Sequence, residues 1–393
     1  MNTQSYRMED ALETIIDYRG KTPNKAAFGI PTLSAKSVKN GFIDYSECYY
    51  ISQDEYDRFM VRGFPQKGDI LLTTEAPMGM VAKLDRDDVA IAQRLLTLRG
   101  KKDILDNDFL MYYLQSPIGQ SKLAERETGS TVTGIKQAEF RKIVIDIPNI
   151  TTQKKIAYII SGLDERIAIN KAINKNLEEQ ALAVYKKMFV DVRKNRKRCR
   201  ADECFDITIG KTPPRKEKEW FSYDPNDVVW VSISDMGTSG AFISSSSEFL
   251  TQAAVDRFNI KVVPDKTVIL SFKLTVGRVA ITDGLLTTNE AIAHFKTEDR
   301  DITEYLYCYL VRYDFASLGS TSSIATAVNS KMIKEMEFVV PDAEEEKMFH
   351  SIVSPMFDAI RNNLRENRQL LLIKDCIIPR VLAGKFDLEN LGL

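Results

Sequence analysis

The chain contains two stretches in which residues of a buried seam recur at strictly alternating steps of four and three. The first begins at Ile156, and the second begins 193 residues later at Phe349. This is the spacing of the a and d positions of a heptad, so it predicts two long helices that each have one coiled-coil face. The seam positions are Ile156, Ile160, Leu163, Ile167, Asn170, Asn174, Leu177, Ala181, Val184 and Met188, and then Phe349, Val353, Met356, Ile360, Asn363, Asn367, Leu370, Lys374, Ile377 and Val381.

Both seams carry two asparagines at the same adjacent positions, close to the middle of the seam. An antiparallel pairing of the helices would bring Asn170 opposite Asn367 and Asn174 opposite Asn363. Buried amides would then meet amides, and a polar layer of this kind fixes register and orientation at some cost in stability. The alternative is two unrelated amphipathic helices whose asparagines coincide by chance.

Segments upstream of each long helix also recur in the same order, which indicates an internal duplication. They are a Gly-Lys-Thr-Pro turn (20–23 and 210–213), a strand, polar loop and second strand (30–43 and 229–243), a β-hairpin (67–82 and 265–280), a short helix (109–114 and 305–310), a Gly-Ser-Thr loop (129–131 and 319–321) and a closing strand (143–148 and 336–341). We therefore predict an α+β fold in which two duplicated α/β domains are separated by two long helices that form an antiparallel coiled coil with pseudo-twofold symmetry.

The predicted domains follow from this order. They are a first globular domain at 1–150, a long helix at 151–192, a basic linker at 193–202, a second globular domain at 203–342, a second long helix at 343–383 and a C-terminal tail at 384–393. The linker contains six basic residues in eight, from Arg193 to Arg200. We interpret this run as a solvated connection, with a contact to a DNA backbone as the alternative.

Composition restricts the class of protein. A chain of 393 residues with 44% hydrophobic and 28% charged residues is typical of a globular protein with two to three domains. No apolar run approaches the length of a membrane helix and no leader pattern is present, which predicts a cytoplasmic location. The net charge of −1 gives no overall signal for nucleic acid, so DNA binding would depend on local patches or on a partner. The five cysteines form no Cys-x-x-Cys pair, and we expect reduced thiols.

No catalytic motif, metal site or cofactor site is evident. The two Gly-Lys-Thr triplets lack the glycine that a P-loop requires five residues earlier, where Ile15 and Phe205 stand. Two histidines, His294 and His350, do not suffice for a catalytic triad or a metal centre. The acidic residues after Asp342 suit the first turn of the second long helix. We predict a protein that is not an enzyme.

Taken together, these motifs and their duplicated order resemble the specificity (S) subunit of type I restriction-modification systems. The resemblance covers the whole chain and rests on the Gly-Lys-Thr-Pro turns, Gly68-Asp69-Ile70-Leu71-Leu72 with Glu75-Ala76-Pro77-Met78-Gly79, Ile91-Ala92-Gln93-Arg94, Gly129-Ser130-Thr131-Val132 with Ile135-Lys136, and Ile378-Pro379-Arg380-Val381-Leu382-Ala383-Gly384-Lys385. It implies a phage-defence role. Two target recognition domains would each read half of a bipartite site in double-stranded DNA. The helix pair would hold them apart and dock two methyltransferase (M) subunits, with restriction (R) subunits as further partners.

Polar and basic loop residues are the candidates for DNA contact, because such side chains bind phosphates and base edges. They are Lys21, Thr22, Asn24, Lys25, Ser34, Lys36, Ser130, Thr131 and Lys136 in the first domain, and Lys211, Thr212, Arg215, Lys216, Ser234, Lys273, Arg278, Ser320 and Thr321 in the second. Tyr185, Phe189 and Leu382 flank the seams and are candidates for docking of methyltransferase subunits; they could instead cap the cores of the domains. Two other functions stay open: a non-catalytic coiled-coil adaptor that presents two protein-binding domains, and a nuclease with an unrecognised carboxylate site.

Overall fold

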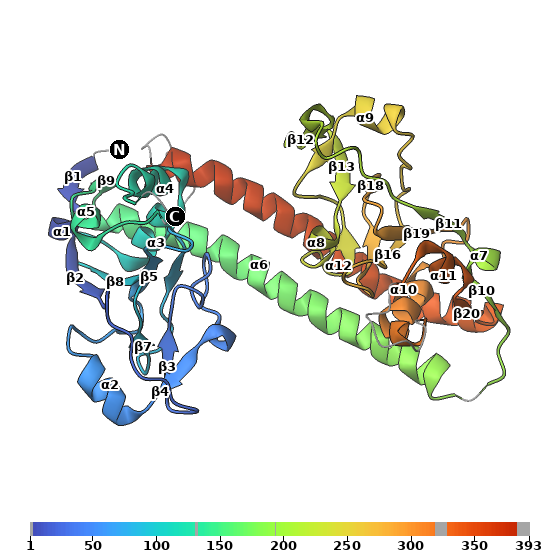
Figure 1. Ribbon diagram of the computed structural model, residues 1–393, viewed down its shortest axis with the longest axis horizontal. Coiled ribbons are helices and arrows are strands. Elements are labelled where there is room, and N and C mark those ends of the chain that lie inside the picture. Colours follow the sequence, from blue (N-terminus) through green and yellow to red (C-terminus); the bar gives the residue numbers. More distant parts are fainter. Residues whose placement is uncertain (1–2, 130–132, 193, 319–327, 383–393) are drawn as a thin grey trace. The chain divides into compact units, whose positions relative to one another are not determined.

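A computed structural model describes residues 3–129, 133–192, 194–318 and 328–382 (Figure 1). The side chains of Ile378, Pro379, Val381 and Leu382 are not described. The chain divides into two compact units, which we describe separately. Unit 1 is Met1–Ile167 with Gln369–Leu393, and unit 2 is Ala168–Arg368. Each unit therefore combines one globular domain with a segment of each long helix. The fold is mixed α and β, as predicted.

Unit 1 contains three sheets. The first pairs β1 (Thr3–Arg7) with β9 (Val144–Pro148), so the start of the domain meets its closing strand. The second has the order β2-β8-β5-β6 (Leu12–Asp17, Leu95–Gly100, Ile70–Thr73 and Val81–Lys83), and the third has the order β4-β3-β7 (Tyr49–Ile51, Ile30–Leu33 and Ala90–Ile91). Strand β5 reads Ile-Leu-Leu-Thr and is buried throughout, so both of its faces belong to cores. The helices are α1 (Met8–Ala11), α2 (Gln53–Phe59), α3 (Asn107–Gln115), α4 (Pro117–Ala124) and α5 (Gln137–Arg141), with the 3₁₀ helix η1 at Tyr45–Glu47.

Unit 2 repeats this arrangement. It pairs β10 (Arg198–Arg200) with β20 (Glu337–Val339), and it has one sheet ordered β11-β19-β16-β17-β14 (Asp206–Ile209, Ile292–Lys296, Val268–Ser271, Val279–Thr282 and Phe242–Ile243) and one ordered β12-β15-β13-β18 (Phe221–Ser222, Phe249–Leu250, Val228–Val231 and Thr287–Thr288). The helices are α7 (Ala201–Cys204), α8 (Ile233–Met236), α9 (Gln252–Arg257), α10 (Thr303–Arg312) and α11 (Ser330–Glu335), with η3 at Lys218–Trp220 and η4 at Phe315–Leu318.

The predicted strand, loop and second strand is only partly right. In unit 2 the second strand is β14, but the matching residues 40–43 of unit 1 form only an isolated bridge between Val38 and Ile43. The predicted strand at 229–234 ends at Val231, and helix α8 follows. The reason is local, because the Ser232 hydroxyl accepts a hydrogen bond from the Asp235 amide at 3.3 Å and the Asp235 carboxylate accepts one from the Ser232 amide at 2.8 Å. This capping box starts a helix.

The long helices are α6 (Ile150–Tyr185), extended by a π-helical turn, η2, at Lys186–Val190, and α12 (Ala343–Leu382). The first turn of α12 carries Glu344, Glu345 and Glu346, where acidic residues suit the positive end of a helix. Every predicted seam position with a described side chain is buried or half-buried. In unit 1, Ile156, Ile160 and Ile377 pack into the domain core; in unit 2, Ala181, Phe349 and Val353 do so. Among the described residues, no helix is long and apolar enough to cross a membrane.

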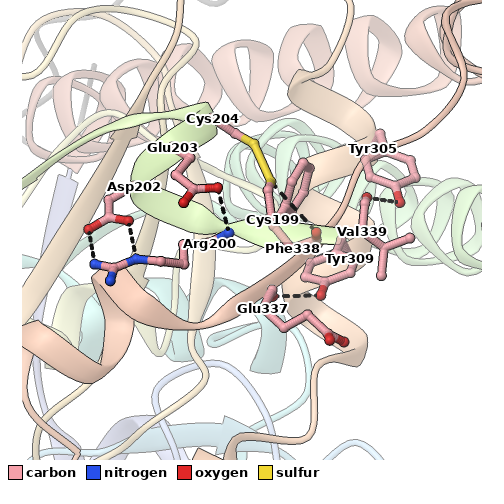
Figure 2. The surroundings of a disulfide bond; sticks show 10 residues. All are labelled: Cys199, Arg200, Asp202, Glu203, Cys204, Tyr305, Tyr309, Glu337, Phe338 and Val339. Carbon is pink, nitrogen blue, oxygen red and sulfur yellow. Dashed lines mark hydrogen bonds and ion pairs between the residues drawn. A yellow bond between two sulfur atoms is a disulfide. The ribbon is translucent and has the colours of Figure 1, made fainter. Parts of the chain in front are cut away.

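Two cysteines are not free thiols, so that prediction is wrong for them. Cys199 lies in β10 and Cys204 ends α7, which directly follows β10, and the two cysteines form a disulfide (Figure 2). Cys48, Cys308 and Cys376 are free. The strand opposite the disulfide is held by two tyrosines of α10: the Tyr305 hydroxyl donates to the Val339 carbonyl at 2.7 Å, and the Tyr309 hydroxyl donates to the Glu337 carbonyl at 2.8 Å.

In its described part, residues 194–200, the basic run is mostly exposed, but several of its cations pair with carboxylates of unit 2. Arg196 is buried, donates to the Glu345 carboxylate at 3.0 and 3.1 Å, and also donates to the carbonyl of Met188 at 3.0 Å. Lys194 pairs with Asp342 and Glu345, and Arg198 pairs with Glu337 at 2.9 Å. Glu345 lies in the first turn of α12, so these basic residues join the domain to that helix. Their charges are already matched by carboxylates, which leaves little for a DNA backbone.

Candidate nucleic-acid interface

The tip of the β5–β6 hairpin in unit 1 lies against the end of the Gly-Ser-Thr loop. Glu75 and Gly134 form a β-bridge, and the Ile135 amide donates to the Thr74 carbonyl at 2.9 Å. A side chain at Gly134 would come within 2.5 Å of that carbonyl oxygen, so the close approach requires glycine. Lys136 follows directly and is exposed, while Arg94 pairs with Glu75 at 3.1 Å. The hairpin tip and the described residues 133–136 thus lie together. Ser130 and Thr131 lie outside the described residues.

The other candidates of unit 1 lie by the β4-β3-β7 sheet. Lys21, Thr22 and Lys36 are exposed. Asn24 is held by Glu55, whose carboxylate accepts from the Asn24 amide at 2.8 Å, and Lys25 lies over the Tyr49 ring at 4.9 Å. The Ser34 carbonyl accepts from the Ser37 amide in a turn. Sequence reasoning missed an apolar part of this surface, because Phe28 is 82% exposed, and a lone exposed aromatic has no periodicity that would reveal it.

In unit 2, three candidates near the Gly-Lys-Thr-Pro turn are engaged within the domain. The Lys211 ammonium donates to the Phe258 carbonyl at 2.7 Å, and the Thr212 hydroxyl donates to Glu290. Arg215 lies over the rings of Phe221 and Trp230 at 4.5 and 4.6 Å. It also pairs with Glu248 at 2.6 Å, whereas its neighbour Lys216 is exposed. The stacking and the ion pair fix the orientation of the Arg215 guanidinium. Arg215 would therefore have to give up these contacts in order to reach a base.

The remaining candidates of unit 2 gather by the β16–β17 hairpin. The Arg278 guanidinium donates to the Ile233 carbonyl at 2.5 Å, so the structure brings Arg278 beside Ser234 of α8. Lys273 is exposed at the hairpin tip, and the neighbouring Leu274, which sequence reasoning did not select, is 99% exposed. Ser320 and Thr321 lie outside the described residues.

Both histidines of unit 2 contact polar side chains within the domain. His294 is fully buried between the hydroxyls of Thr208 and Thr288, at 3.0 and 2.7 Å, and burial lowers its pKa to about 3. His350 contacts the Glu304 carboxylate at 2.9 Å, and burial raises the pKa of that carboxyl despite the hydrogen bond from His350, which opposes the shift. Across the part of the chain that the structure describes, no group of three or more histidines, cysteines or carboxylates could hold a metal ion.

Two of the three predicted docking residues are not exposed, and that expectation is corrected. Tyr185 is 5% exposed and half-buried Phe189 packs on it, with ring centroids 5.4 Å apart. Phe189 also meets Tyr305 and Phe349 at 4.8 and 5.4 Å. These rings close the core of unit 2 at the end of α6, which is the alternative that the sequence left open. The side chain of Leu382 lies outside the described residues.

The four seam asparagines lie in unit 2. The Asn170 amide donates to the Asn367 carbonyl oxygen at 2.9 Å, and the Asn363 amide donates to that of Asn174 at 2.8 Å. Asn170 also donates to Glu366 at 2.8 Å. The structure thus brings together the pairs that an antiparallel arrangement requires. Three of their buried polar atoms, Oδ1 of Asn170 and Nδ2 of Asn174 and Asn367, have no partner in the structure, which is the cost of a polar layer.

The structure defines a protein with two corresponding globular domains joined to two long helices. A family model described as the type I restriction modification DNA specificity domain matches the chain twice, over residues 15–179 and 195–371. The type I restriction enzyme MjaIX specificity subunit of Methanocaldococcus jannaschii is 26% identical over 418 residues, which cover 95% of this chain and 91% of that protein. The HindI specificity subunit of Haemophilus influenzae is 23% identical, over 81% of this chain and 87% of that protein.

A solved structure shares the fold. The S subunit of a type I restriction-modification system from M. genitalium aligns with a TM-score of 0.57 and 14% identity, over 97% of this chain and 96% of that chain. The chain therefore belongs to the type I restriction-modification DNA specificity family, and it is a specificity subunit with two DNA specificity domains. Subunits of this family are non-catalytic and work with DNA and with the other subunits of the system.

Proposed function

We propose that each globular domain reads one half of a bipartite site in double-stranded DNA. The observation that carries this proposal is that the two domains share a fold while the residues at their hairpin tips differ. Both units have the same three-sheet plan and the same hairpin, yet Glu75-Ala76-Pro77 at one tip corresponds to Lys273-Leu274-Thr275 at the other. Different side chains on one scaffold suit two different half-sites. We retain the domain limits given above as part of this proposal, except that the linker contributes strand β10.

We further propose that α6 and α12 form an antiparallel coiled coil that sets the spacing of the half-sites. The asparagine pairs support this arrangement in unit 2. In unit 1, the Lys374 ammonium donates to the Asp164 carboxylate at 2.6 and 2.8 Å, which agrees with the same antiparallel pairing. The asparagines act as the register of the pair. Replacing Asn170 and Asn367 together by Leu should raise stability and loosen the register, because apolar layers pack equally well after a shift.

The exposed residues define where contacts with DNA are to be sought. Lys21, Thr22, Lys36, Lys136, Lys216, Ser234 and Lys273 have the greatest freedom, and we propose them for phosphate or base contacts; the other described candidates would first lose contacts within their domain. The slope of log K for DNA binding against log salt concentration reports the number of phosphate contacts. Replacing one lysine that contacts a phosphate should reduce this slope by about one.

Docking of two methyltransferase subunits requires surfaces other than Tyr185 and Phe189. Large exposed apolar residues on the helices of unit 1 suit this role, with Tyr158 71% and Leu372 65% exposed. We propose that these helix surfaces bind the methyltransferase subunits and that restriction subunits join the assembly in turn. Replacing Leu372 by Asp should weaken assembly while the free chain keeps its melting temperature; the exposed Glu344 replaced by Gln serves as a control that leaves assembly unchanged.

A domain exchange tests the proposed function. Residues 1–150 are replaced by the corresponding domain of another family member, and methylation sites of the complex with methyltransferase subunits are mapped. One half-site should change and the other should stay. A change in both half-sites would contradict independent reading. A salt series of DNA binding by the same complex separates the alternatives, because an adaptor would show no DNA binding and a nuclease would cleave without partners.

A further inference from the structure

The tips of the two hairpins have the same hydrogen bonds although their sequences differ. In unit 1 the Thr73 hydroxyl donates to the Pro77 carbonyl at 2.6 Å and accepts from the Met80 amide at 2.9 Å. In unit 2 the Ser271 hydroxyl donates to the Thr275 carbonyl at 2.6 Å and accepts from the Arg278 amide at 3.0 Å. Both hydroxyl residues are fully buried. Each tip is therefore held from within by one buried hydroxyl.

The same backbone conformation places a side chain at one equivalent point of each tip. Ala76 and Leu274 each stand three residues after the buried hydroxyl residue, with φ of +55° and +59°. Residues that carry a Cβ rarely adopt this left-handed region, and glycine would adopt it without strain. A non-glycine residue in this conformation at the same point of both tips motivates the hypothesis that the side chain there has a role.

Leu274 is the most exposed large apolar residue among those described, at 99%. At this exposure the Leu274 side chain contributes almost nothing to the core of the domain. The tip residues 272–278 include two cations, Lys273 and Arg278, and no acid. In unit 1 the corresponding residues 74–80 include one acid, Glu75, which Arg94 neutralises. The tip of unit 2 thus combines an apolar point with positive charge, which suits the edge of a base beside a phosphate.

We propose that Leu274 contacts the 5-methyl group of a thymine in the half-site that the second domain reads. The thymine methyl is the one apolar group on the base edges of the major groove, and apolar side chains read it directly. Lys273 then contacts a neighbouring phosphate. The inference rests on the proposed reading of DNA by this domain. It adds a specificity-determining residue and requires an A·T pair in that half-site.

The test uses the full chain in complex with its methyltransferase subunits and duplexes that carry the mapped site. Each thymine of the second half-site is replaced singly by deoxyuridine, which removes only the methyl group. One replacement should weaken binding of the wild-type complex by about fourfold, the equivalent of one buried methyl group. Leu274→Ala should weaken binding to the thymine duplex and be insensitive to that replacement. Its melting temperature should be unchanged, since the Leu274 side chain contributes almost nothing to the core.

Matched controls make the outcomes decisive. Deoxyuridine in the first half-site should affect wild type and Leu274→Ala equally, and Lys273→Ala should weaken binding to all duplexes alike. The proposal is overturned if Leu274→Ala loses affinity equally for thymine and uracil duplexes, as a non-specific wedge or a protein contact would, or if the half-site contains only G·C pairs. Absence of any sequence-specific binding by the wild-type complex would instead contradict the proposed function itself.

Discussion

The two units share a fold but attach the long helices by different contacts. In unit 2 the Asp283 carboxylate accepts hydrogen bonds from Arg361, Arg365 and Arg368 of α12 at 2.6, 2.7 and 2.9 Å. In unit 1 the polar contact is smaller: Lys374 of α12 pairs with Asp164 of α6, and the Tyr112 hydroxyl donates to the same carboxylate at 3.0 Å.

The charged cluster of unit 2 has no counterpart in the first repeat. The residues that correspond to Arg361, Arg365 and Arg368 are Ala168, Ala172 and Lys175, and the residue that corresponds to Asp283 is Asp85, which accepts from Tyr45. Burial opposes ionisation of Asp283, but hydrogen bonds and charge from Arg365 and Arg361 outweigh it and lower its pKa. Duplication therefore preserved the sheets and hairpins, while each domain acquired its own attachment to the helices.

The largest effect should come from Asp283→Asn. Its side chain is 4% exposed and that of Arg361 is 12% exposed, so removal of the carboxylate leaves a buried guanidinium with only the more exposed Asp265, at 2.6 Å, as a counter-charge. We expect a loss of about 2 kcal/mol in the free energy of unfolding, because the hydrogen bonds to a buried carboxylate are lost while Asp265 still partly neutralises Arg361. Because the pKa of Asp283 is lowered, its stabilisation is present at neutral pH and disappears as the pH falls through the folded-state pKa, below about 4. Hydrogen exchange in β17 reports the change.

The matched variant is Asp85→Asn, at the corresponding position of unit 1. Asp85 is exposed, and its replacement should cost less than about 1 kcal/mol. Equal losses in the two variants would contradict the difference between the units.

Glu346→Gln should stabilise the chain at alkaline pH. Burial first, and then the negative charges of Asp299 and Asp301, raise the pKa of Glu346 to about 7. The folded state keeps this proton between about pH 4.5 and 7 while the unfolded state releases it, so stability falls as the pH rises through that window. The variant should gain about 1 kcal/mol at pH 8, after allowance for partial exposure, and nothing at pH 4.5. Thermal unfolding across pH measures this. Exposed Glu344→Gln should show no such crossover; a similar one there would argue against the local cause.

The smallest effect should follow Lys374→Met in unit 1. The ion pair is partly exposed, with side-chain exposures of 18% for Lys374 and 38% for Asp164, and Tyr112 still serves the carboxylate when the lysine is removed. Partly exposed pairs stabilise proteins by about 0–1 kcal/mol, and methionine restores apolar contact in the seam. A thermal shift as large as that of Asp283→Asn would show that unit 1 also depends on a charged attachment.

The sequence predicted what periodicity and repetition encode. The heptad pattern located both helices and their buried faces, and the repeated markers located the hairpins and the helices α3 and α10. It could not show that Tyr185 and Phe189 are covered, because their partners Tyr305 and Phe349 are more than a hundred residues away in the chain. The Asp283 cluster was missed because its arginines stand 78 to 85 residues further along the chain, beyond the reach of any periodicity. Leu274 was missed because exposure of one apolar residue leaves no pattern in the sequence.

The central claim is that the helix pair sets the distance between two independent readers of DNA. One heptad is inserted after Leu177 and one before Asn363, on the same side of the asparagine layer, and the methylation sites of the complex are mapped. Each helix lengthens by about 10 Å, so the spacer should grow by about three base pairs with both half-sites unchanged. Insertion of three residues instead should abolish binding, because one reader rotates away from its groove. An unchanged spacer in the heptad variant would mean that the partner subunits or DNA bending set the distance, and would contradict the account.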